Sequence, residues 1–206
     1  MGASVAQSQT QAAVQVTAAP AKTPITADVF VKNLTAEVMA TVRQDKAIQS
    51  GDLRRVVSLV DGKILPYVNF QRMTASAVGR HWRQATPDQQ KRLQAEFKGL
   101  LIYTYAGAVA QIRDQQIEVR PLRARPDDTD VVVRTLVRGK GDPIQLDYRM
   151  EKLGDGWKIY DVNVLGVWLA DTSFKSQFSP IAANQGIDAL ISNLVDLNKK
   201  AAAGGK

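Results

Sequence analysis

The chain has no cysteine and one histidine, His81, among its 206 residues. The absence of cysteine excludes disulfides, thiol nucleophiles and cysteine-ligated metal sites. A single histidine also excludes metal sites that need two of them, such as the H-E-x-x-H motif. Any Ser-His-Asp triad would have to use His81, so the common catalytic and metal-binding constellations are largely absent.

Long apolar runs are lacking too. No segment approaches the roughly 18 apolar residues that suggest a membrane-spanning helix. With 45% hydrophobic and 23% charged residues, the composition is that of a globular protein long enough to bury a core. The net charge of +7 indicates attraction to anionic surfaces. Nucleic acid, phospholipid headgroups and acidic proteins all fit that charge.

The first 24 residues are small and polar, and none of them is acidic. They lack the basic start and the apolar core of about 7–15 residues that mark a secretory signal peptide. Two interpretations remain: a mature export product with an added start, or a plain tail. Because this composition gives no packing stripe, we expect residues 1–24 to be disordered, and residues 200–206 likewise.

Helical patterns dominate residues 26–112. Four apolar residues recur at every fourth position of the first helix: Phe30, Leu34, Val38 and Val42. The stretch TPDQ places Thr86 as an N-cap, Pro87 as the first helical residue and Gln89 as the capping-box partner. We expect the helix that begins there to run to about Ile112.

Strand patterns follow over residues 115–166. Short turns separate four runs: QQIEVRPLRA, TDVVVRTLVRG, PIQLDYRMEKL and GWKIYDVNVLG. The short turns predict an antiparallel meander of four strands, with one face towards water and one towards the helices. Closing helices are expected over 168–199. The sequence therefore predicts one α+β domain over residues 25–199, with six to seven helices around the sheet.

Three segments resemble a known family. They are FQRMTASAVGRHWRQATPDQQKRLQAEFKGLLIYTYAGAV, GWKIYDVNVLGVWLADTSFKSQF and QGIDALISNL. The first two are similar to the central helical signature and the second signature of the MlaC-type, toluene-tolerance-related periplasmic phospholipid-binding proteins, and the third to their C-terminal helix. The resemblance covers about residues 26–199, and it implies an NTF2/cystatin-like sheet wrapped by helices around an apolar cavity.

The resemblance also implies a function and a location. It predicts a soluble, monomeric periplasmic carrier that holds phospholipid as cargo and uses no cofactor, metal or nucleic acid. The implied partners are an inner-membrane MCE-type ABC transporter complex and an outer-membrane lipoprotein–porin complex. Shuttling between them would maintain outer-membrane lipid asymmetry.

The chain departs from the family pattern near its second signature. Leu165 stands where Glu is frequent, Trp168 where Ser is usual, and Ser173-Phe174-Lys175 where Asn-Tyr-Arg is usual. Lys175 keeps the positive charge, but lysine cannot clamp a phosphate in the bidentate manner of arginine. These departures concern headgroup contacts more than acyl-chain binding.

The predicted pocket lies between the apolar face of the sheet and the facing helices, and Gly166 is expected to turn the chain sharply from sheet to helix. The expected lining residues are Ile64, Tyr67, Phe70, Met73, Leu101, Tyr105, Val131, Val133, Ile144, Leu146, Tyr148, Val162, Val164, Val167, Leu169, Phe174 and Phe178. Lys175 and Arg72 are the expected headgroup contacts at the mouth.

Apolar stripes of this kind also occur in a completely filled core. Spacing alone therefore does not decide between a cavity and a filled core. An enzyme with an acid or base in an apolar pocket is the alternative function. Its polar groups would come from Tyr103, Tyr105, Tyr148, Asp147 and Asp161. Nucleic-acid binding is a third hypothesis, which steep salt dependence would reveal.

Overall fold

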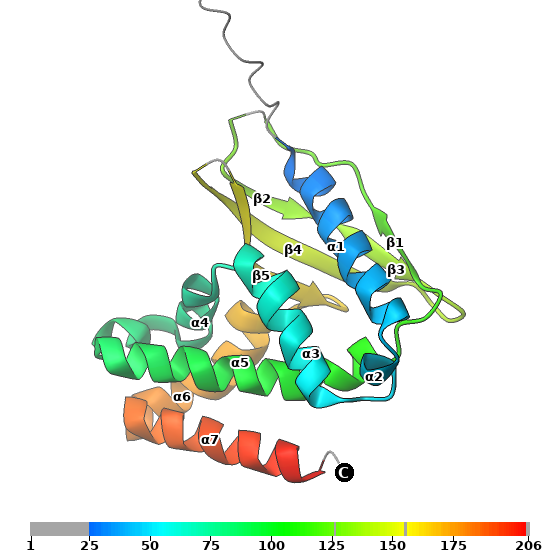
Figure 1. Ribbon diagram of the computed structural model, residues 1–206. Coiled ribbons are helices and arrows are strands. Elements are labelled where there is room, and N and C mark those ends of the chain that lie inside the picture. Colours follow the sequence, from blue (N-terminus) through cyan, green and yellow to red (C-terminus); the bar gives the residue numbers. More distant parts are fainter. Residues whose placement is uncertain (1–24, 126, 155, 205–206) are drawn as a thin grey trace, which may run out of the picture.

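The structure is a computed structural model that describes residues 25–125, 127–154 and 156–204. The expected tail over residues 1–24 lies outside the described residues, as do residues 205–206 at the other end. One helix lies along the sheet, and the remaining helices lie below the sheet in the view of Figure 1.

In the part of the chain that the structure describes, five α-helices precede the sheet and two follow it. They are α1 (Ala27–Gln44), α2 (Lys46–Gln49), α3 (Leu53–Leu59), α4 (Phe70–Val78), α5 (Pro87–Ala110), α6 (Lys175–Gln185) and α7 (Ile187–Gly204). Four tighter or wider helical turns connect them: the π-helical η1 (Val60–Ile64) and η4 (Leu169–Phe174), and the 3-10 helical η2 (Leu65–Tyr67) and η3 (Gly79–Gln84).

The start of α5 has the capping box expected from its sequence. The Thr86 hydroxyl accepts a hydrogen bond from the Gln89 N–H at 3.3 Å, and the Gln89 side chain accepts one from the Thr86 N–H at 2.9 Å. The helix ends at Ala110, slightly before the expected Ile112. At the other end of the chain, α7 continues to Gly204 instead of stopping near residue 199, because the alanines there favour helix.

The sheet is antiparallel throughout. Its strands are β1 (Gln116–Val119), β2 (Asp130–Val133), β3 (Thr135–Arg138), β4 (Ile144–Leu153), β5 (Gly156–Val164) and β6 (Val167–Trp168). They are ordered β1-β3-β4-β5-β6, and β2 also pairs with β4. The predicted α+β class with an antiparallel sheet is therefore confirmed, although the described residues form six strands and not four.

One of the extra strands arises because the second predicted strand is interrupted at Arg134. Its two parts, β2 and β3, pair with successive stretches of β4. At the interruption, the Thr135 N–H donates to a carboxylate oxygen of Asp147 at 3.1 Å, and the Thr135 hydroxyl donates to the carbonyl of Leu146. Side chains therefore supply part of the strand pairing at this point.

The other extra strand follows Gly166 and corrects the predicted sheet-to-helix junction. Leu165 and Gly166 have φ values of 52° and 90°, so two consecutive left-handed residues form a tight hairpin. The chain reverses into β6, where Val167 pairs with Val164. The helical segment begins only at Leu169, in η4. Gly166 therefore connects two strands, and not a strand to a helix.

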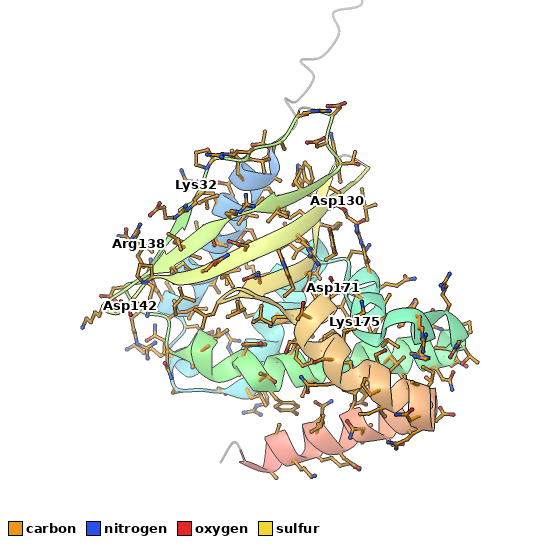
Figure 2. The ribbon with its side chains drawn as sticks, turned by 180° about the vertical axis from the view of Figure 1, so that it is seen from behind. Lys32, Asp130, Arg138, Asp142, Asp171 and Lys175 are labelled. Atoms are coloured by element: carbon orange, nitrogen blue, oxygen red, sulfur yellow. The ribbon has the colours of Figure 1, made fainter. Side chains whose placement is uncertain are left out.

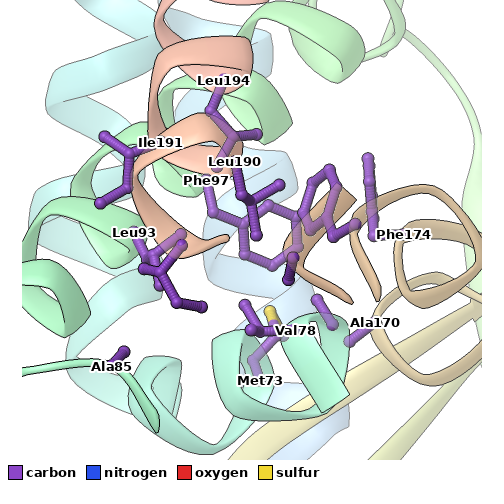
Figure 3. Packing of buried hydrophobic residues seen from close by; sticks show 14 residues of the cluster. Met73, Val78, Ala85, Leu93, Phe97, Ala170, Phe174, Leu190, Ile191 and Leu194 are labelled. Carbon is purple, nitrogen blue, oxygen red and sulfur yellow. The ribbon is translucent and has the colours of Figure 1, made fainter. Parts of the chain in front are cut away.

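The hydrophobic core has three parts. The first is filled by α4, α5, α6, α7 and η4, where Phe97, Phe174, Leu190 and Leu194 meet (Figure 3). In the second, α1 packs on the sheet through Val31 against residues of β2, β4 and β5. The third joins the end of α1 to α2, α3 and α5. Together these parts fix α3, α5 and the sheet around the cavity described below.

Asp45 links two helices through a carboxylate whose charge matters. It caps α2 by accepting the N–H groups of Ala47 and Ile48 at 3.0 and 3.1 Å, and it receives Arg55 of α3 at 2.6 Å. The Arg55 hydrogen bond, followed by the Ile48 N–H, holds the pKa of Asp45 below its ordinary value. The stabilisation is therefore complete above the unfolded pKa of about 4 and is lost as pH falls through the folded pKa.

Asp45→Asn keeps a capping oxygen but removes this charge. We expect the variant to melt below the wild type at about pH 7, and the gap to shrink as pH falls to about 3. Thermal melts followed by circular dichroism measure it. A gap that stays constant over this range would contradict the role assigned to the carboxylate charge.

Candidate functional site

A cavity of about 350 Å³ lies between α3, α5 and η1 on one side and β4 and β5 on the other. Figure 1 shows the elements that surround it. The volume falls within the range of about 300–1,000 Å³ that is usual for small-molecule sites. Its lining is almost wholly apolar, so it suits a hydrocarbon ligand and offers water few partners.

The alternation of β4 and β5 brings much of the predicted set together. Leu146 and Tyr148 point into the cavity from β4, and Val162 and Val164 point into it from β5. The remaining predicted residues that line the cavity are Ile64, Phe70, Met73, Leu101, Tyr105 and Leu169. Ten of the predicted pocket residues therefore line the cavity.

Four predicted pocket residues lie in filled core instead. Val131 and Val133 face the same side of the sheet as the cavity, but α1 covers them there. Phe174 and Phe178 pack around Phe97, with ring centroids 4.9 and 5.5 Å from its own. Each of these four residues is buried among apolar side chains, but another element of the fold fills the space in front of it. None of the four lines the cavity.

Three further predicted residues lie towards solvent. Tyr67, Ile144 and Val167 are 37%, 45% and 44% exposed. Tyr67 packs edge-on against Phe30 of α1, at 5.3 Å between ring centroids. Val167 follows the hairpin at Gly166, and this reversal carries it away from the position that a direct sheet-to-helix turn would give it.

Other wall residues were not predicted. Most are helical, and they are Val56, Val60, Leu65, Val68, Phe97, Lys98, Ile102, Ala106, Val109, Ile159 and Ala170. The helix α5 packs against α7 as well as against the cavity, so it is apolar on more than one face and its rotation cannot be read from one stripe. Ile159 enters the wall because a bulge between Arg149 and Met150 shifts the register of β5.

The hydroxyl groups in the wall belong to two tyrosines. Burial raises the pKa of Tyr105, and burial together with the charge of Asp147 raises the pKa of Tyr148. Both phenols are therefore neutral at physiological pH. They can donate a hydrogen bond to a ligand, but neither serves as a base there.

The carboxylates considered for an enzyme lie on the opposite face of the sheet. Asp147 accepts the N–H of Thr135, and Asp161 accepts the N–H groups of Ala170 and Asp171 at 2.9 and 3.2 Å. Burial raises the pKa of Asp161 in spite of these bonds. Since Asp147 alternates with Leu146 on β4, the sheet itself separates its side chain from the cavity.

The two predicted headgroup cations have other partners. Arg72 bonds to Glu151 at 2.6 Å and to Asp130 at 3.0 Å, and it lies 3.5 Å over the ring of Tyr160. Lys175 pairs with Asp171 at 3.2 Å, beside the open face of the sheet (Figure 2). Neither residue lines the cavity.

The described part of the chain has no helix long and apolar enough to cross a membrane. Over the same residues, no group of three or more His, Cys, Asp or Glu side chains is placed to hold a metal ion.

Comparison with known proteins gives concordant matches. The family described as MlaC protein matches residues 32–196. The intermembrane phospholipid transport system binding protein MlaC of Haemophilus influenzae is 26% identical over 141 residues, which cover 66% of this chain and 65% of that protein. The toluene tolerance protein ttg2D of Pseudomonas putida is 26% identical over 159 residues, 77% of this chain and 74% of that one.

A solved structure is similar as well. It is the phospholipid-binding protein of Ralstonia solanacearum in complex with a phospholipid, with 45% identity and a TM-score of 0.83. The match covers 85% of this chain and 98% of that one.

Proposed function

Because this chain belongs to the MlaC protein family, we propose that it is a carrier that binds the acyl chains of a phospholipid in the cavity between α5 and the sheet. The observation that carries the proposal is the apolar wall formed by Leu146, Tyr148, Val162 and Val164 opposite α5. The phospholipid complex of the Ralstonia relative supports the choice of ligand.

The energetics of acyl chains favour a site that removes them from water. Each methylene removed from water contributes about 0.8 kcal/mol, so two tails with about thirty methylenes represent roughly 20–25 kcal/mol. An open surface groove leaves much of that area wet, whereas a cavity removes it from water. A carrier must also release its cargo. Docking to a donor or an acceptor would therefore have to deform the wall.

The route of the cargo is a further part of the proposal, and it rests on the resemblance to that family. We infer that the protein works in the periplasm, and that it shuttles phospholipid between an inner-membrane MCE-type ABC transporter complex and an outer-membrane lipoprotein–porin complex. Such a shuttle would maintain outer-membrane lipid asymmetry. It needs neither a nucleotide nor a catalytic group, which fits the neutral phenols of the cavity and the position of Asp147 behind the sheet.

Native mass spectrometry of the purified chain tests the proposal. We expect a species with one bound phospholipid per chain, because the apolar residues opposite α5 line a single cavity. Denaturation should release the lipid for identification by extraction. A bare chain mass, under conditions that preserve the lipid complex of a known carrier, would contradict the proposal and favour the enzyme hypothesis.

A further inference from the structure

Among the described residues that line the cavity, Lys98 is the only one that carries a charge. Its ammonium lies 3.1 Å from a carboxylate oxygen of Asp61. The two side chains are 34% and 45% exposed. Since Lys98 belongs both to the cavity wall and to the surface, this ion pair marks the place where the cavity meets solvent. Its apolar stem follows the wall while its charge reaches water.

The pair joins two different elements of the wall. Lys98 lies on α5, whereas Asp61 lies in the π-helical turn η1, between Val60 and Ile64, which both line the cavity. No residue of η1 or of η2 is buried. Segments with so few buried contacts are the ones that open at low free-energy cost. Lys98–Asp61 connects η1 to α5, and Lys63–Glu37 connects it to α1.

An anionic ligand at this mouth would compete for the same ammonium. A partly exposed ion pair contributes little net stabilisation, so a second anion of comparable charge can replace the first. Lysine acts on phosphate as a point charge and needs no bidentate geometry. The cations expected at the mouth from the sequence, Arg72 and Lys175, lie away from the cavity and bind other carboxylates.

We propose that Lys98 binds the phosphate of the phospholipid, and that Asp61 is the group that this phosphate displaces. The ion pair is then a latch: it closes η1 against α5 when the cavity is empty, and the phosphodiester of an entering lipid opens it. This inference rests on the proposed function, because it assumes that acyl chains occupy the cavity. Beyond that function, the latch makes the site select lipids whose headgroup carries a negatively charged phosphate.

A competition between two lipids with the same tails tests the latch. After endogenous lipid has been extracted with detergent, the protein is incubated with vesicles that contain equal amounts of dioleoyl phosphatidylglycerol and dioleoylglycerol. Native mass spectrometry of the re-isolated protein then gives the ratio of the two bound lipids. We expect the wild type to prefer phosphatidylglycerol, and Lys98→Met to lower the ratio about tenfold, since it removes a charged hydrogen bond.

Asp61→Asn should have the opposite effect. The asparagine no longer competes for the ammonium, so we expect the ratio to rise several-fold. Lys91→Met is the matched control, because Lys91 lies on the same helix, is 79% exposed and does not line the cavity. It should leave the ratio unchanged. Lys98→Gln serves as a second variant if Lys98→Met does not fold, as judged by its melting curve.

The outcomes separate the latch from the function beneath it. If the wild type and every variant bind both lipids in the same ratio, the carrier function stands and the latch is wrong. The same conclusion follows if Lys98→Met loses both lipids equally, since Lys98 would then only support the wall. If the wild type takes up neither lipid, the proposed function fails and the latch fails with it.

Discussion

Replacing Leu146 by aspartate is expected to empty the cavity without unfolding the sheet. Leu146 lies half-buried on β4, pairs with Val164 of β5, and lines the cavity with it. A carboxylate there would face acyl chains without a hydrogen-bond partner, and burying such a charge costs many times more than burying a neutral polar group. In the empty protein, water can enter and solvate the same carboxylate. The penalty therefore applies to the lipid complex more than to the fold.

The measurement is the amount of phospholipid that co-purifies with each chain. We expect Leu146→Asp to reduce it at least about tenfold, which corresponds to roughly 1.4 kcal/mol and is a small part of the expected penalty. Val167→Asp is the control, since Val167 is 44% exposed on β6 and lies outside the cavity wall. If Leu146→Asp keeps both its circular dichroism spectrum and its full lipid content, the cavity assigned here is not the binding site.

The same substitution at Val133 would be a poor test, although the sequence places Val133 and Leu146 on equivalent faces. Val133 is completely buried beneath α1, so an aspartate there would disrupt the packing of that helix on the sheet. Two residues with the same alternation thus have different surroundings. The difference arises from α1, which packs over β1 and β2, whereas the cavity lies beside β4 and β5.

Local signals in the sequence are sufficient to predict most of the helices and strands. The capping box at Thr86 defines the start of α5, and alternation on β4 shows that Leu146 and Tyr148 share a face. Both signals depend on residues close together in the chain. For that reason the α+β class and half of the cavity wall follow from periodicity and from the family resemblance.

The features that the sequence did not predict depend on contacts between residues far apart in the chain. The hairpin at Leu165 and Gly166 places a non-glycine residue in the left-handed region, a choice that no local propensity favours. The bulge beside Arg149 brings Ile159 into the wall and cannot be read from one strand alone. Lys98 was not predicted as a headgroup contact, because its place at the cavity depends on how α5 packs beside η1 and Asp61.

Filled and hollow parts of the core should respond differently to truncation. Phe178 is 1% exposed and packs against Phe97 and Phe174, so Phe178→Ala removes contacts on every side. We expect it to lower the free energy of unfolding by about 3–5 kcal/mol. At about 2–4 °C per kcal/mol, the melting temperature should fall by roughly 10 °C. Because Phe178 does not line the cavity, the lipid bound per folded chain should stay unchanged.

Ile64→Ala is the matched truncation in the hollow part. Ile64 is half-buried and faces the cavity from η1, so in the lipid-free protein its side chain has fewer protein atoms to lose. We expect a cost of about 1 kcal/mol, below the usual range of about 2–5 kcal/mol for isoleucine to alanine. In the wild type, bound lipid supplies Ile64 with contacts that an alanine cannot make. The gap between Ile64→Ala and wild type should therefore widen when both carry lipid. Equal losses for the two variants in lipid-free melts would show that the space beside α5 is packed as tightly as the core around Phe97.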